Sequence, residues 1–312
     1  MSDISLQYLD QPLTNVSLGY QNADFYAERL LPLLPVQKQS GRYWVFGKEK
    51  LQRYETIRRA GDEARQIAAW SLSNNPYFCD DHALKDSIAD EERANSDGTD
   101  LEISTTENLT NAILLDLEIR AFNLVMGASS AVPNTTLSGT SQWSDYVNSD
   151  PISAVEAQKT TIKKATAKTP NTLALSYPVF AALRQHPKII DRFKYTQVGV
   201  LDESALKTAF GVQNFWVMGA EYSTANEGQS PALDFVWGKN ALLAYIPPEP
   251  RRREVALGYT FRWLFGAAEL GGTLVKRYRV ESKTADVIEV HRYDDQEIVA
   301  ASAGYVFLSA VA

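Results

Sequence analysis

A chain of 312 residues with 45% hydrophobic and 22% charged residues has the composition of a folded globular protein, which excludes bulk disorder. Its net charge of −7 argues against a protein that grips nucleic acid over a wide surface, because such binding is electrostatic and needs a basic surface. No run of 18 apolar residues occurs, so no membrane span is expected, and the single cysteine, Cys79, cannot form an internal disulfide.

The first 47 residues predict an N-terminal arm. The apolar stretch "FYAERLLPLLPV" (25–36) is interrupted by Pro32 and Pro35, and the aromatic run "RYWVF" (42–46) is typical of a strand. Prolines inside such a stretch prevent one continuous helix. We therefore expect an extended arm, residues 1–47, that lies on another surface.

The next segment, residues 48–80, is charged and has few clustered apolar residues. Its first 18 residues hold six basic and four acidic side chains. Such a segment has little with which to build its own core. It is either a solvated excursion or a flap that packs on a partner, and the flap is favoured. Residues 80–107 then hold ten acidic residues against Lys85 and Arg93, which predicts a solvated helix and loop.

The clearest helix is predicted over residues 104–126. Ser104 and Glu107 fit the S-x-x-E capping box of a helix start. At 1.5 Å per residue this helix would reach about 34 Å, and we expect its apolar face to pack on a β-sheet of the same subunit. Residues 128–150 are polar and turn-rich and predict a loop. The apolar positions recur at helical spacing up to Gly127: Leu109, Ile113, Leu117, Ala121 and Leu124.

Two further helices have clear ends. Asp150 before Pro151 indicates a helix start, and that helix runs to about Lys168. Asp202 starts a shorter helix, which Gly211 ends.

The remaining elements are mostly strands. Residues 172–175 predict a strand that leads into a helix opening at Ser176 and Pro178 and ending before Pro187. Because helices come early and strands dominate late, without a repeat, the fold class is α+β. The other strands are expected at 212–222, 233–237, 241–246, 257–265, 273–281, 286–292 and 303–311.

Catalytic chemistry is mostly absent from the sequence. The three histidines, His82, His186 and His291, lack zinc-ligand spacing, and no P-loop, dinucleotide fingerprint or nucleophile elbow occurs. Cys79 precedes Asp80 and Asp81, whose charge would raise the pKa of the thiol, the wrong direction for a nucleophile. We therefore predict no catalytic, cofactor-binding or metal-binding residues, and no cofactor.

The acidic motifs and the arginine run keep two interpretations each. The acidic pairs in "DDH" (80–82) and "YDDQE" (293–297) could bind a cation, but exposed turns are favoured because the spacing of a calcium loop is missing. The arginines at 251–253 form either a contact patch, slightly favoured, or a solvated loop. His186, before a proline at a helix end, is expected to bond free helix carbonyls.

One family resembles this chain in the order of its elements. The helix 151–168, "TLALSYPVFAALRQHPKIIDRFKY", "LKTAFGVQNFWVMGAEYSTA" and "FVWGKNALLAYIPP" together resemble the axial domain of tailed-phage major capsid proteins of the Hong Kong 97-type (Johnson) fold. The resemblance implies five parts: an N-terminal arm (1–47), an extended loop (48–80), a peripheral domain (81–149) with a spine helix (104–126), an axial domain (150–256), and return strands of the peripheral domain (257–312).

The resemblance also implies a function. Such chains assemble as pentamers and hexamers into an icosahedral head around double-stranded DNA, without sequence-specific contacts to it. Expected partners are further copies of the chain, a portal protein, in some members a decoration protein, and a separate scaffolding protein, because the fold-bearing sequence begins almost at Met1. The expected location is the virion capsid, assembled in the host bacterial cytoplasm. Two alternatives remain: an encapsulin-like compartment shell, and an intracellular enzyme with an unrecognised site.

Overall fold

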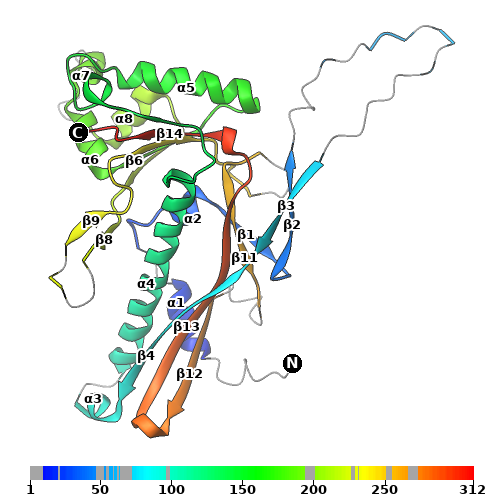
Figure 1. Cartoon of the computed structure of the whole chain (residues 1–312). Coiled ribbons are helices and arrows are strands. Elements are labelled where there is room, and N and C mark those ends of the chain that lie inside the picture. The colour runs from blue at the N-terminus through cyan, green and yellow to red at the C-terminus, as the bar shows by residue number, and fades with distance from the viewer. Residues whose placement is uncertain are drawn as a thin grey trace.

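The computed structural model contains two β-sheets joined by one long helix, with two ribbons projecting from the body (Figure 1). The class is mixed helix and sheet, as predicted. The structure describes these residues: 10–19, 22–46, 53, 56–58, 60–61, 63, 72–95, 99–193, 201–225, 229–230, 232–250, 255–265 and 273–312.

The first sheet is organised around one long strand. β13 pairs antiparallel with three strands, β4 along one edge and β11 and β12 along the other. β1 then adds to β11 in parallel, which brings the N-terminal part of the chain beside its C-terminal part. The strands are β1 (Leu33–Val36), β4 (Asp80–Ala89), β11 (Gly258–Trp263), β12 (Thr273–Val280) and β13 (Ala285–Ile298).

The second sheet has the order β5-β14-β10-β6-β7. All residues of β6 and β10 are buried, because helices pack on one face and the long helix on the other. The strands are β5 (Asn134–Thr136), β6 (Thr172–Ser176), β7 (Asn214–Met218), β10 (Ala241–Ala244) and β14 (Gly304–Leu308). The covering helices are α5 (Pro151–Thr166), α6 (Tyr177–Arg184), α7 (Pro187–Phe193) and α8 (Glu203–Phe210).

The long helix, α4 (Thr99–Met126), contributes to the cores on both sheets. Ile113 joins Val275, Ile288 and Val290 of the first sheet. Further along the helix, Leu117 belongs to the cluster that includes residues of the second sheet. A helix of 28 residues spans about 42 Å, so α4 links the two layers as a strut (Figure 1).

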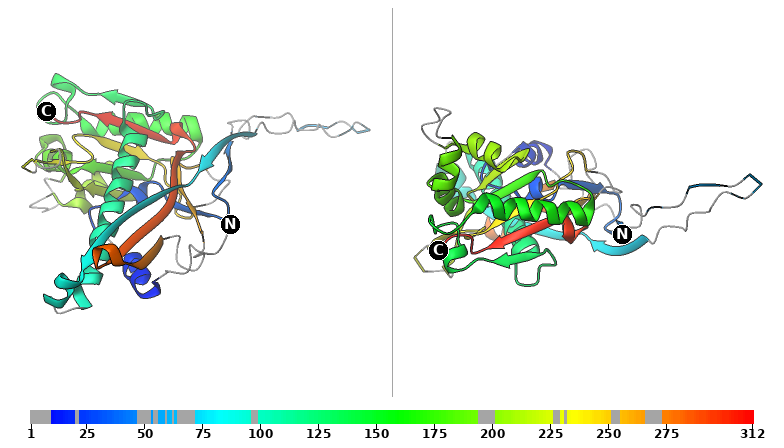
Figure 2. Two further views of the ribbon diagram at one scale, coloured as in Figure 1. Left: turned by 60° about the horizontal axis from the view of Figure 1, so that its bottom comes forward. Right: turned by 90° about the horizontal axis from the view of Figure 1, so that it is seen from above.

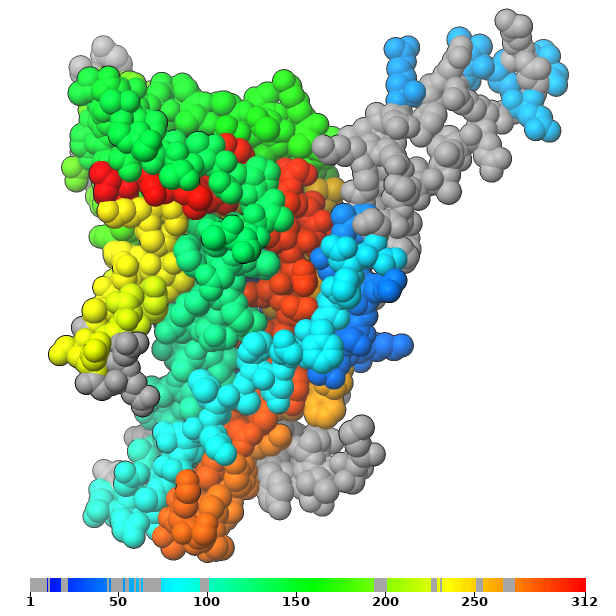
Figure 3. All heavy atoms as spheres, viewed as in Figure 1, coloured from blue at the N-terminus to red at the C-terminus, as the bar shows by residue number. Residues whose placement is uncertain are grey.

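Two ribbons extend from opposite sides of this body. One consists of β2 (Ser40–Phe46) and β3 (Leu72–Phe78), the other of β8 (Glu221–Ser223) and β9 (Leu233–Phe235). Figure 2 shows the β2–β3 ribbon on the side away from α6–α8, and Figure 3 shows the β8–β9 ribbon standing out from the body in yellow. The remaining helices are α1 (Gln11–Gly19), α2 (Ala27–Leu30) and α3 (Asp90–Asn95), with 3-10 turns at Gly139–Ser141, Glu281–Lys283 and Ala301–Ala303.

The helix ends predicted in the second half of the chain are confirmed. The Asp150 carboxylate accepts a hydrogen bond from the Ser153 backbone N–H at 3.0 Å, and Asp202 does the same for Ala205 at 2.8 Å. Gly211 ends α8 with φ at 57°, the left-handed region in which glycine has no Cβ penalty. The other predicted strands also form, although β13 is longer than expected and the strand predicted over 212–222 is divided into β7 and β8, which belong to different sheets.

Three sequence predictions are wrong. The N-terminal arm is not simply extended, because α1 and α2 form in it and its described residues pack on their own subunit. Residues 80–89 form strand β4 rather than a solvated helix and loop. Ser104 and Glu107 do not start the long helix, which begins five residues earlier at Thr99. Solvent-facing charges on an edge strand account for the acidic composition that concealed β4.

The boundary predicted at residue 257 does not follow the sheets. β14 pairs with β10 and β5, so the last strand of the chain belongs to the second sheet, with β6 and β7. β5 lies within the segment predicted as peripheral (81–149) and joins the same sheet. The reason is that parallel and antiparallel pairing bring together strands far apart in the sequence, which local patterns cannot show.

Candidate functional site

Two of the three histidines lie on the paired strands β4 and β13. His82 stands opposite Arg292 in the ladder and His291 opposite Ala83, so the two imidazoles project from opposite faces. His291 Nδ1 lies 3.0 Å from Asp81 and Nε2 lies 2.7 Å from Glu289. Each ring nitrogen of His291 therefore faces a carboxylate. In the part of the chain that the structure describes, no three His, Cys, Asp or Glu residues gather as a metal site.

The two acidic motifs lie on paired strands, residues 80–82 on β4 and residues 293–297 on β13. The exposed turns favoured above are therefore wrong. Asp80 pairs in register with Asp294, and Asp81 with Tyr293. The Asp294 side chain is fully buried, and Arg120 and Arg292 hold its two oxygens at 2.9 and 2.8 Å. The motif therefore supplies an internal counter-charge for arginines.

The other candidate residues are structural in their surroundings. Burial raises the pKa of the Cys79 thiol to about 12, the predicted direction, with Asp295 and Asp294 adding to it. His186 is fully buried and its Nε2 lies 3.0 Å from the Ser149 hydroxyl, so the expected bond from its ring to a helix carbonyl is wrong. The arginines at 251–253 and most of the charged segment from 48 to 71 lie outside the described residues.

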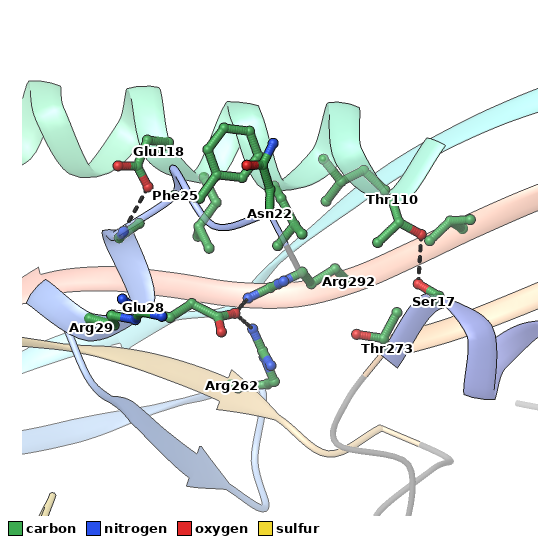
Figure 4. Close-up of a pocket in the computed structure, with 15 residues that line it drawn as sticks. Ser17, Asn22, Phe25, Glu28, Arg29, Thr110, Glu118, Arg262, Thr273 and Arg292 are labelled. Atoms are coloured by element: carbon green, nitrogen blue, oxygen red, sulfur yellow. Dashed lines mark hydrogen bonds and ion pairs between the residues drawn. The ribbon is translucent and has the colours of Figure 1, made fainter. Parts of the chain in front are cut away.

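A polar junction lies where the N-terminal arm, α4 and the first sheet meet (Figure 4). Its centre is Glu118, whose carboxylate is fully buried. The backbone N–H of Tyr26 donates to it at 3.0 Å, that of Ala27 at 2.6 Å, and the indole Nε1–H of Trp237 at 2.6 Å. One side chain thus connects three segments that are remote in sequence.

A chain of ion pairs continues from this centre through the first sheet. Glu28 of α2 accepts a bond from Arg262 of β11 at 3.0 Å and also pairs with Arg292 of β13. Arg292 binds Asp294, and Asp294 binds Arg120 of α4. Because each arginine has a carboxylate partner, the site is close to neutral and is not an anion-binding cluster.

Smaller contacts attach the rest of the arm around a cavity of about 220 Å³. The hydroxyls of Ser17 and Thr110 lie 2.7 Å apart, joining α1 to α4. The Thr14 hydroxyl accepts a bond from the Val275 N–H of β12 at 3.1 Å, and Thr260 donates from its hydroxyl to the Leu31 carbonyl at 2.9 Å. This arrangement can hold and orient the N-terminal arm. Among its described residues, no nucleophile converges with a general base.

The base of the β2–β3 ribbon is fixed by aromatic packing. The Tyr77 ring stacks on Phe261 of β11, with centroids 4.7 Å apart and planes at 10°. The ring lies over Gly41, where a Cβ would be 2.6 Å from the Tyr77 hydroxyl oxygen. Asp295 accepts a bond from the Phe78 N–H at 2.8 Å, and burial raises the pKa of this carboxyl. The ribbon therefore leaves the first sheet at a defined angle.

A second ionic cluster lies at the opposite end of the first sheet. Asp286 of β13 binds Arg93 at 2.5 Å and Arg277 at 3.2 Å, and Glu102 of α4 binds the same two arginines at 2.8 Å. Burial acts to raise the pKa of Asp286, but its bonds to Arg93 and Arg277 outweigh burial and hold the pKa below its ordinary value.

Neither Glu118 nor Arg292 is predicted as a site residue by the sequence patterns above. The available signal for Glu118 is its position one residue after Leu117 on the apolar side of a long helix, where an acidic residue is buried only if it has partners.

No helix in the described chain has the length and apolarity needed to cross a membrane.

The chain is similar in sequence to phage proteins. Residues 129–245 match the family described as phage major capsid protein E. The chain is 28% identical over 308 residues to the major capsid protein of Burkholderia phage BcepMu, with 96% of each chain covered.

Solved structures are similar over most of the chain. A phage-related protein from Bordetella bronchiseptica RB50 superposes with a TM-score of 0.78 at 25% identity, covering 97% of each chain. The capsid structure of cyanophage P-SCSP1u gives a TM-score of 0.58 at 9% identity, covering 93% of this chain and 89% of the other, which is likeness of fold alone.

Proposed function

Because the chain belongs to the phage major capsid proteins and has their Hong Kong 97-type fold, we propose that it assembles in many copies, as pentamers and hexamers, into the icosahedral head that encloses double-stranded DNA. It is a structural protein of the virion capsid and not an enzyme.

The observation that carries the proposal is the length of the match. Similarity to a major capsid protein extends over 96% of both chains, so the whole chain corresponds and not one module. The geometry agrees with this. Buried polar groups such as those of Glu118, Thr14 and Thr260 bind the N-terminal arm, and we propose that the arm and the β2–β3 ribbon take part in contacts between subunits.

The finer parts of the proposal follow the family resemblance. They are assembly in the host bacterial cytoplasm, a separate scaffolding protein, a portal protein and, in some heads, a decoration protein. The acidic net charge of −7 suits a container that encloses DNA without binding its sequence. We also propose that the chain needs no cofactor and has no metal site.

The division into parts is proposed in the same way. The arm (1–47), extended loop (48–80), peripheral domain (81–149) with its spine helix, axial domain (150–256) and return strands (257–312) follow the order of the family. We group β5 and β14 with the axial strands, because they pair in the second sheet, and we propose α4 as the spine helix.

The test is expression of the chain together with its neighbouring genes, followed by sedimentation and negative-stain microscopy. We expect closed particles several hundred ångströms across. A chain that remains a small oligomer under all these conditions would overturn the proposal. Particles filled with one host enzyme and lacking scaffold or DNA would instead identify a compartment shell of the encapsulin kind.

A further inference from the structure

We propose that Glu118 is the positioning residue that docks the N-terminal arm onto α4 and ties the docked arm to the second sheet, and that assembly requires this docked state. The second part rests on the proposed capsid function. The first part concerns the isolated subunit and can be tested without assembly.

The geometry of Glu118 is that of a latch with three attachment points. Its two oxygens accept from the N–H groups of Tyr26 and Ala27 and from the Trp237 indole. Tyr26 and Ala27 open α2, and Tyr26 has no side-chain oxygen suited to capping. Glu118 therefore supplies, from another helix, an acceptor for the first two N–H groups of α2, those of Tyr26 and Ala27.

A contribution to general stability explains this site poorly. Among the described residues, no arginine or lysine forms an ion pair with the Glu118 carboxylate. The nearby charge of Glu28 has the same sign and acts to raise the pKa of Glu118. Burial raises the pKa of Glu118, against the three N–H donors, which lower it. A protein with an apolar residue at such a buried position is often at least as stable as one with a buried charge. The Glu118 carboxylate therefore contributes mainly to the position of the arm relative to α4.

The three attachment points join the arm to α4 and to the turn that precedes β10 of the second sheet. Trp237 is fully buried in the turn before β10, and its ring meets Phe122 of α4 edge-on at 5.8 Å. The arm residues reach Glu118 only when α2 lies against α4 (Figure 4). The same arm passes on to β1 and the β2–β3 ribbon, so an undocked arm would displace the ribbon base.

The test uses two variants that separate charge from reach. Glu118→Gln keeps the length but points an NH₂ group toward N–H donors, and Glu118→Asp keeps the charge but is one methylene short. Both should leave a folded subunit in which the Tyr26 and Ala27 amides exchange at least tenfold faster and trypsin cleaves after the exposed Arg29 sooner. Trp237→Phe, which loses one of three donors, should give an intermediate effect.

Two controls make the result specific. Glu107→Gln changes an exposed carboxylate on the same helix and should behave as the wild type. Val155→Ala opens a cavity in the core under α5, far from the arm, and lowers stability without touching the latch. If Val155→Ala speeds exchange at Tyr26 and Ala27 as much as Glu118→Gln does, Glu118 only contributes general stability and the latch is refuted.

Assembly is the second readout. Under conditions in which the wild type forms particles, both Glu118 variants should give at least tenfold fewer closed ones. Normal particles from Glu118→Gln would overturn the requirement for docking. If the wild type itself never forms particles, the capsid proposal fails, whereas the exchange measurement still decides the role of Glu118.

Discussion

Single residues in this subunit are constrained most strongly where α4 meets a sheet. Leu117 is 1% exposed and packs with Ala121 and Val125 in the cluster that joins α4 to the second sheet. Its neighbour Glu118 is equally buried, but it is satisfied by three N–H donors. This turn of α4 therefore tolerates a carboxylate at position 118 but not at position 117.

Replacing Leu117 by Asp should abolish the soluble folded subunit. The substitution buries an unpaired charge in an apolar cluster, one of the few changes that cost about 4–5 kcal/mol or more. Expression level, solubility and urea unfolding report the loss. Ile103→Asp on the same helix, where the side chain is 36% exposed, is the matched control and should remain folded. A soluble, assembling Leu117→Asp protein would show that this face is not buried.

Asp286 predicts a loss of stability in acid. Its pKa is held below the ordinary value in the folded chain, so its contribution is present above the unfolded pKa, about 4, and disappears as pH falls through the folded pKa. Asp286→Asn should therefore lower the free energy of unfolding by about 1 kcal/mol at pH 7, with a smaller difference below about pH 4.

Urea midpoints of the wild type and Asp286→Asn at pH 7 and pH 3.5 measure this effect. Asp295 and Glu297 act in the opposite direction, because burial raises the pKa of each, and their contribution fades as pH rises through that raised pKa. Asp295 and Glu297 are present in both the wild type and the Asp286→Asn variant. The difference between the two urea midpoints therefore isolates the contribution of Asp286. A difference that stays constant with pH would contradict the assignment.

At the scale of elements, what the sequence could predict depended on whether the signal was local. The ends of α5 and α8 were predictable because Asp150, Asp202 and Gly211 act on their own helix. Strand β4 was not, because its exposed charged residues resemble a solvated loop until β13 is known to lie beside it. The start of α4 was misplaced since a capping-box pattern can also occur inside a helix.

The candidate site was harder to predict than the fold. Glu118, Tyr26 and Trp237 meet through backbone N–H groups and one indole, and no motif records where a backbone N–H will point. The pairing of Asp80 with Asp294 likewise depends on strand register. The absence of a recognisable catalytic motif could be read directly, because such motifs are local in sequence.

The β2–β3 ribbon offers a test at this scale. Gly41→Ala would place a Cβ 2.6 Å from the Tyr77 hydroxyl oxygen and 2.8 Å from its ring, so the ring must leave its stack on Phe261. We expect a loss of about 1–3 kcal/mol from this overpacking. The measurement is a double-mutant cycle by urea unfolding. In a Tyr77→Ala background the same Gly41→Ala change should be nearly neutral; equal costs in both backgrounds would show that the contact is not the cause.

For the whole molecule, the prediction concerns the charged segment predicted as a flap between subunits. Deleting residues 50–70 and bridging them with Gly and Ser should leave a folded subunit, because the described core contacts lie outside this range. The same protein should fail to close stable particles. Circular dichroism and sedimentation separate these two outcomes, and normal particles from the deletion would remove the segment from the assembly contacts.

Salt should affect the two steps differently. Contacts between exposed charges weaken above about 0.1 M salt, whereas apolar cores are hardly screened. Early assembly should therefore slow with added salt while the urea midpoint of the subunit changes little.

The parallel pairing of β1 with β11 also bears on how the chain is made. Leu33–Val36 find their partner only at Thr260–Trp263, and β11 in turn needs Asp294–Ile298. During synthesis the first of these strands must wait for almost the entire chain to leave the ribosome, and such distant pairing folds slowly. A truncated product ending before β11 would keep β1 unpaired and protease-sensitive, which pulse proteolysis of stalled chains can measure. Only complete chains would then fold and join a growing lattice. Incomplete chains would be excluded from the lattice because β1 has no partner in them.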